Sequence, residues 1–255
     1  MNRLSATPLI FGAGFLMLLV GLWRIDASPE RIWTGLGRLG WLVALMWPPS
    51  PGGAFADLLK GLAESLAMAF LGSLLAAVAA LPLALLGAGN VVGSALLRFS
   101  ARRIFDGLRG IDALIWALIF VSAVGMGPFA GILALAVSDT GTLAKLFSEA
   151  LEGADRRQVE AVRAAGAGRG LAIRLGLLPQ VAPVMLSQVL YTLESNTRSA
   201  TILGVVGAGG IGLALSDRIR INNWDEAAFI MLMILAMVAA IDLASRMIRL
   251  RLIRP

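Results

Sequence analysis

The chain has 255 residues, of which 58% are hydrophobic and 15% are charged, and its net charge is +6. Soluble domains carry about a quarter charged residues, so this composition indicates an integral membrane protein. The chain contains neither cysteine nor histidine, which excludes disulfides, thiolate metal sites, the usual catalytic triad and the histidine zinc motif of hydrolases.

Six apolar segments approach the ~20 residues that a bilayer-crossing helix needs. The first ends abruptly at Arg24 with no convincing cleavage site after it, so we interpret it as a retained anchor. Pro82 is expected to kink the second. The predicted spans cover residues 8–23, 58–88, 108–124, 128–146, 181–206 and 227–248.

The segment between the first two spans is apolar from residue 32 to 47, but glycines and Arg38 interrupt it. Its tryptophans favour the headgroup zone, so we expect an interfacial segment rather than a seventh span. The sequence therefore predicts an all-α polytopic membrane protein in two parts. Residues 1–57 hold the anchor helix and the interfacial segment, and residues 58–255 form the main transmembrane domain.

Basic residues lie mostly at one set of span ends, which predicts that the N-terminus and the C-terminus are both cytoplasmic. The same pattern explains the positive net charge through membrane topology, so we expect contact with membrane lipid and none with nucleic acid. With this orientation, the polar segment that follows the fourth span also lies in the cytoplasm.

This polar segment, about 147–179, has apolar residues at helical spacing, with charged residues on its other faces. Gly166, Gly168 and Gly170 should end a first helix, and a second short helix is expected from Leu171 to Leu177. Pro179 would then begin the next span. Such a hairpin can dock on a cytoplasmic partner; the alternative is an ordinary surface loop.

The hairpin contains Glu160-Ala161-Val162, then Gly166 and the pair Leu178-Pro179. This spacing resembles the EAA loop of ABC importer permeases, from which Val162 and Gly176 depart in identity. The resemblance implies that the hairpin couples the spans to an ATPase. The residues to which it assigns this coupling are Glu160, Ala161, Arg163, Gly166, Leu178 and Pro179.

Two further stretches, 116–131 and 191–212, are similar to phosphonate permeases of the PhnE type, within the binding-protein-dependent (MetI-like) importer family. The resemblance spans about 58–248. It implies a bacterial cytoplasmic (inner) membrane protein that pairs with a second copy of itself. It also implies ABC ATPase subunits and a periplasmic or lipid-anchored substrate-binding protein.

The chain carries no nucleotide-binding motor of its own. A P-loop requires a Gly-Lys-Ser/Thr ending, but Lys60 and Lys145 are the only lysines and neither follows glycine. The glycine run at 207–212 lacks a surrounding βαβ unit, so we interpret it as a turn or as an anion gate. We therefore expect no cofactor on this chain, with ATP and Mg²⁺ on the partner ATPase.

The fifth span contains charged and polar residues that a lipid-facing helix would not carry. An Arg guanidinium there suits an oxyanion, although Glu194 and Arg198, one helical turn apart, could equally form a structural ion pair. The predicted translocation path consists of Glu194, Asn196, Thr197, Arg198 and Thr201.

The leading interpretation is a permease subunit, not an enzyme, that moves phosphonate or a related phosphorus oxyanion. One alternative is the same machine with another small solute, such as methionine or a metal chelate. Another is a secondary transporter driven by an ion gradient. An intramembrane enzyme is disfavoured by the missing histidine and cysteine.

Overall fold

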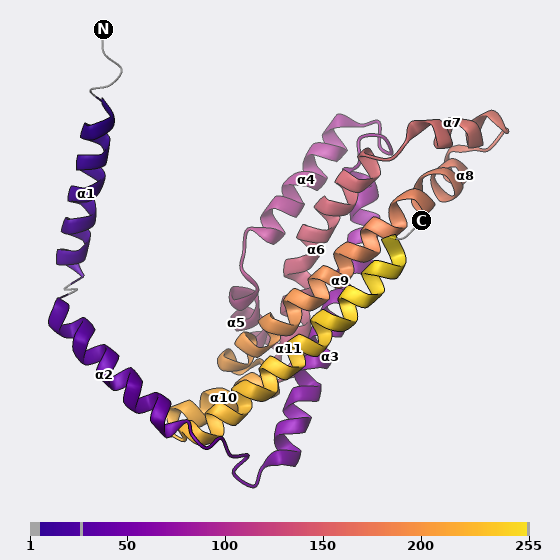
Figure 1. Cartoon of the computed structure of the whole chain (residues 1–255). Coiled ribbons are helices and arrows are strands. Elements are labelled where there is room, and N and C mark those ends of the chain that lie inside the picture. Colours follow the sequence, from indigo (N-terminus) through magenta and orange to yellow (C-terminus); the bar gives the residue numbers. More distant parts are fainter. Residues whose placement is uncertain (1–5, 26–27, 254–255) are drawn as a thin grey trace. The chain divides into compact units, whose positions relative to one another are not determined.

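The computed structural model describes residues 6–25 and 28–253, and all regular structure in these ranges is helical (Figure 1). The chain divides into two units, residues 1–49 and 50–255. Within the described ranges, four helices are long and apolar enough to cross a membrane, or up to six if each of two bent helix pairs counts as one span. The predicted all-α fold is confirmed, and six spans is the upper of these counts.

The N-terminal unit consists of α1 (Ala6–Arg24) and α2 (Pro29–Leu45). α1 matches the predicted anchor helix. Ser28 caps the start of α2, because its hydroxyl accepts a hydrogen bond from the Arg31 N–H at 3.3 Å, and Pro29 is the first residue of the helix. Most of the segment that was predicted to be interfacial is therefore helical, and its placement at the membrane surface stays a prediction.

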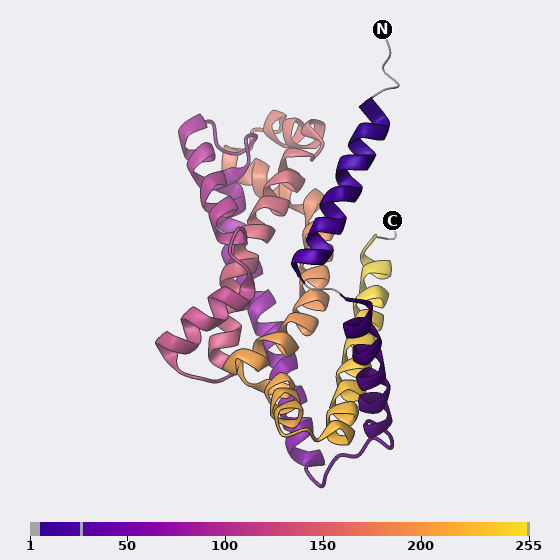
Figure 2. The same ribbon diagram turned by 90° about the vertical axis from the view of Figure 1, so that its left-hand side faces the viewer.

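The second unit is built around four long helices, α3 (Phe55–Gly87), α6 (Pro128–Glu152), α9 (Leu178–Leu203) and α11 (Trp224–Ile253), seen in Figures 1 and 2. α3 packs on α6 through small residues, since Ala76, Ala80 and Ala84 are fully buried. A Cβ at Gly72 would lie 2.7 Å from Leu135 Cβ. Such close backbone approach is typical of helix packing in membranes, where small residues take the place of a hydrophobic driving force.

The third predicted span, 108–124, is wrong in its boundaries. The structure has two helices there, α4 (Ala95–Arg109) and α5 (Ala113–Val124), bent by 81°. Asp112 causes the break because its carboxylate accepts a hydrogen bond from the Leu114 N–H at 2.8 Å and starts a new helix. α4 is amphipathic and buries Phe105 against α6, where a Cβ at Gly141 would lie 2.7 Å from the Phe105 carbonyl oxygen.

The predicted hairpin lies at one end of the second unit, and the short helix α10 (Gly210–Arg220) lies at the other (Figures 1 and 2). α6 continues to Glu152, past its predicted end at residue 146, because Phe147 and Leu151 extend its buried face. The chain then forms α7 (Arg156–Ala164), α8 (Arg169–Leu171) and a π-helix (Ala172–Leu177) before α9. At the other end a second π-helix, Gly204–Ala208, leads into α10 (Gly210–Arg220).

The glycine run before α10 is a packed turn. Gly207 and Gly209 have φ angles of 95° and 79°, which glycine adopts without steric cost. The N–H of Gly210 donates to Glu64 Oε2 at 3.3 Å, and that of Ile211 donates to Ser65 Oγ at 3.0 Å. These two N–H groups already have partners on α3, so the structure favours the turn over the anion gate.

Candidate functional site

The hairpin between α6 and α9 is closed at its base by one side chain. The Gln180 amide accepts a hydrogen bond from the Asp155 N–H at 3.0 Å and donates to the Asp155 carbonyl at 3.2 Å. It also donates to the Gly176 carbonyl. Asp155 in turn caps α7 by accepting from the Arg157 N–H at 2.9 Å. The point where the chain enters the hairpin is thus tied to the point where it leaves, although no sequence motif indicated Gln180.

The two arms of the hairpin touch at Gly176. A Cβ at this position would lie 3.0 Å from Val159 Cα and 3.4 Å from Val162 Cγ2. A side chain at position 176 would therefore crowd α7, and its absence lets α7 lie this close to the π-helix. Gly176 is one of the two departures from the EAA pattern, and this packing gives a physical reason for it.

Gly176→Leu is expected to push α7 away from the π-helix and to impair uptake, because overpacking costs about 1–3 kcal/mol. Gly170→Leu is the matched control, since nothing lies within 4 Å of a Cβ there. Transport into proteoliposomes and limited proteolysis of the hairpin measure the effect. Equal uptake and equal protease resistance in the two variants would contradict this packing role.

The hairpin presents unpaired charges beside a cavity of about 360 Å³. Arg156, Glu160 and Arg163 line the cavity, and none forms a hydrogen bond or ion pair through its side chain with another residue in the described part of the chain. Arg169 lines the same cavity and donates to the Val91 carbonyl. This arrangement leaves one face of α7 available to a partner.

The other predicted coupling residues lie on α7, just after it, and at the start of α9. Ala161 and Gly166 are exposed, and Gly166 has a φ of 87° where α7 ends. Leu178 is half-buried and Pro179 is exposed at the start of α9. Four of the six residues therefore lie in the hairpin and two lie where α9 begins, while their contact with an ATPase stays a prediction.

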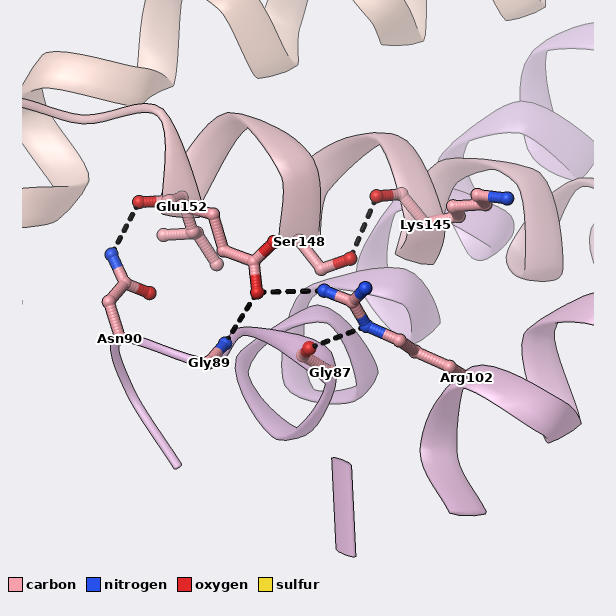
Figure 3. A network of polar contacts seen from close by, with 8 residues as sticks. Gly87, Gly89, Asn90, Arg102, Lys145, Ser148 and Glu152 are labelled. Atoms are coloured by element: carbon pink, nitrogen blue, oxygen red, sulfur yellow. Dashed lines mark hydrogen bonds and ion pairs between the residues drawn. The ribbon is translucent and has the colours of Figure 1, made fainter. Parts of the chain in front are cut away.

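A polar network anchors the base of the hairpin to the bundle (Figure 3). Glu152 Oε1 accepts hydrogen bonds from the Gly89 N–H and from Arg102, both at 2.7 Å. Arg102 also donates to the Gly87 carbonyl at 3.2 Å, and Asn90 donates to the Leu151 carbonyl at 2.6 Å. The C-terminal ends of α3 and α6 are joined here to the middle of α4. The sequence analysis missed this network because its members are far apart in the chain.

The charged residues of α9 pair with α11. Glu194 accepts a hydrogen bond from Arg249 at 2.9 Å, and Arg198 lies 3.8 Å from Glu194 and 3.7 Å from Asp242. The Arg198 side chain is 47% exposed, whereas that of Glu194 is 15% exposed. The sequence indicated the Glu194–Arg198 pair through its i,i+4 spacing, but nothing in it indicated Asp242 or Arg249 as partners.

The remaining predicted path residues do not all share this face. Asn196 and Thr197 are buried at 3% and 0% exposure. Asn196 donates to Asp139 Oδ2 at 2.5 Å and to Ser73 Oγ at 2.9 Å, which links α9 to α6 and α3. Thr201 is half-buried and donates only to the Arg198 carbonyl of its own helix, at 2.7 Å.

A bundle of long apolar helices with a charged helical hairpin at one end is the architecture of a polytopic membrane protein. The chain belongs to the family of binding-protein-dependent transport system inner membrane components, whose model matches residues 80–254. It is accordingly a multi-pass inner-membrane permease of an ABC importer, not an enzyme. The ATPase activity lies in a partner subunit, and a binding protein completes the system.

Two relatives from Stutzerimonas stutzeri match almost the whole chain. The putative phosphite transport system permease protein HtxC is 38% identical over 92% of this chain and 83% of its own length. The phosphite transport system permease protein PtxC is 36% identical over 97% and 89%. Among solved structures, an inward-facing conformation of the MetNI methionine ABC transporter contains a chain with a TM-score of 0.70 and 26% identity. This match covers 80% of the present chain and all of the solved one.

Proposed function

We propose that this permease carries phosphite, phosphonate or a related phosphorus oxyanion into the cell. The observation that carries the proposal is the similarity to two phosphite transport permeases over more than nine-tenths of the chain. The half-exposed guanidinium of Arg198 supports it, because arginine presents a planar set of donors that suits tetrahedral oxyanions.

The permease acts as a pair of identical copies, with ATP and Mg²⁺ bound to the partner ATPase. Both termini lie in the cytoplasm, as does the hairpin, and the unpaired charges of α7 meet the ATPase there. Glu194, Arg198 and Thr201 belong to the translocation path. Asn196 and Thr197 contribute from behind it. Both are buried, and Asn196 holds α9 against α3 and α6 through its hydrogen bonds.

Uptake in proteoliposomes tests the cargo. This chain, its ATPase and its binding protein are reconstituted, and ATP-dependent uptake of phosphite, methylphosphonate, phosphate and methionine is compared. The proteoliposomes should accumulate phosphite or methylphosphonate, and added methionine should not reduce that uptake. Accumulation of methionine alone would contradict the proposal, and flux without nucleotide hydrolysis would indicate a secondary transporter.

A further inference from the structure

The charged cluster between α9 and α11 consists of Glu194, Arg198, Asp242 and Arg249, and its two arginines and two carboxylates sum to zero charge. Charges within a membrane-spanning helix are costly, so such residues face a bundle interior or a water-filled path. Both helices qualify as spans by length and composition. A neutral cluster can therefore be held in the membrane at a tolerable cost while it still contains a cationic side chain that is half exposed.

The four side chains are not held equally. Arg249 is hydrogen-bonded to Glu194 at 2.9 Å and is 28% exposed. Arg198 lies within ion-pair distance of both carboxylates, but its guanidinium makes no hydrogen bond to any residue in 6–25 or 28–253. Asp242 Oδ1 is buried and likewise has no hydrogen-bond partner in these ranges. The N–H donors of Arg198 are therefore available to hydrogen-bond a ligand.

The two turns of α9 that precede Arg198 carry polar side chains on the same face, whereas Ile202, one turn after it, is an exposed apolar residue. Tyr191 is 56% exposed and lies seven residues, about two helical turns, before Arg198, so both project from the same face. Ser195 lies between them on that face and is half-buried. A phenol, a hydroxyl and a guanidinium in succession make this part of the face suited to water or an anion.

We infer that this cluster is a transit site for a tetrahedral phosphorus oxyanion, in which Arg249 is a positioning residue that occupies Glu194 and so leaves Arg198 available. The inference rests on the proposed function. The anion oxygens accept the Arg198 N–H donors, and Asp242 and Glu194 keep the binding weak by their repulsion. Weak binding suits a transport path, because the anion must leave as readily as it enters.

Loss of Arg249 then has a specific consequence. In Arg249→Gln, Glu194 is left with Arg198 as its nearest cation and captures it, so phosphite uptake falls by about tenfold or more. In the double variant Glu194→Gln with Arg249→Gln, Arg198 is free again and uptake returns to within about threefold of the unmodified chain. Arg246→Gln is the control with unchanged uptake, since Arg246 is exposed on the same helix outside the cluster.

A structural ion pair could also show this rescue, so a second readout is needed. The chain has no cysteine, and Ser195→Cys therefore gives a single label site one turn from Arg198. Phosphite should slow the modification of this cysteine by a cationic methanethiosulfonate reagent, and the protection should vanish when Arg198→Gln is added. A merely structural cluster would not respond to phosphite.

The outcomes separate the two claims. The transit site is overturned if phosphite gives no protection, or if the double variant is as inactive as Arg249→Gln. In either case the proposed function still holds, provided that the unmodified chain takes up phosphite. An unmodified chain that accumulates no phosphorus oxyanion overturns both. Should Arg249→Gln fail to reach the membrane, the labelling of Ser195→Cys still decides, because that variant leaves the cluster intact.

Discussion

Glu160→Lys is expected to reduce ATP-driven uptake by about 100-fold, while the protein stays in the membrane. A loss of this size lies near the upper end of the effects that coupling between two sites produces. Glu160 is exposed on α7 between Arg156 and Arg163, and none of the three has a side-chain partner in the described part of the chain. The substitution therefore costs the isolated permease little. It presents an all-cationic face to the partner, so the loss should appear in uptake and in co-purification of the ATPase. Deletion of residues 159–166 should have the same result.

Glu149→Lys is the matched control for this variant. It makes the same change of charge at an exposed position of α6, near the same end of the bundle but outside the hairpin. Uptake should remain near that of the unmodified chain. Normal uptake by Glu160→Lys, or an equal loss in both variants, would show that the hairpin face does not couple the permease to its ATPase.

Asn196→Leu should destabilise the bundle itself, and this is the second large effect. Asn196 donates to Asp139 and Ser73, and it is the only described side chain that donates a hydrogen bond to Asp139. Leucine would leave the Asp139 carboxyl group without a donor among the helices, which costs about 1–3 kcal/mol for a buried polar group and more for a charged one. The thermal midpoint of the purified protein and its yield from membranes should both fall.

Two further variants test the cause of this loss. Thr201→Val lies on the same helix, but its hydroxyl bonds only within α9, so the midpoint should barely change. Adding Asp139→Leu to Asn196→Leu should recover much of the stability, because replacing both partners by apolar groups removes the unmet hydrogen bond. A double variant less stable than Asn196→Leu alone would mean that Asp139 does not depend on Asn196.

Features with a local signal were predicted well from the sequence. The apolar segments identified α3, α6, α9 and α11, since a membrane span is specified by its own composition and length. The hairpin was also predicted, because its helical periodicity and the break at Gly166 both depend on residues that are close together in the sequence. The third span failed because hydropathy alone does not show that the Asp112 carboxylate starts a new helix.

The candidate site was predicted only in part. Glu194 and Arg198 stood out because charges are rare in an apolar helix, and their i,i+4 spacing allowed an ion pair, which the structure contains. The same group of polar residues also suggested Asn196 and Thr197, yet both are buried, and Asn196 points into the bundle toward α3 and α6. A 3.6-residue period says which residues share a face, and the packing of neighbouring helices decides whether that face is buried.

By itself, the sequence determined the membrane class, the all-helical architecture, the hairpin and the resemblance to importer permeases, because all of these depend on composition or on spacing between near neighbours. Only the tertiary structure decided that Arg249 holds Glu194, that Glu152 binds the Gly89 N–H across 63 positions of sequence, and that Gln180 closes the hairpin. Such contacts join residues that belong to different helices or to the turns at helix ends. They depend on how the helices pack, for which no short stretch of sequence carries a signal.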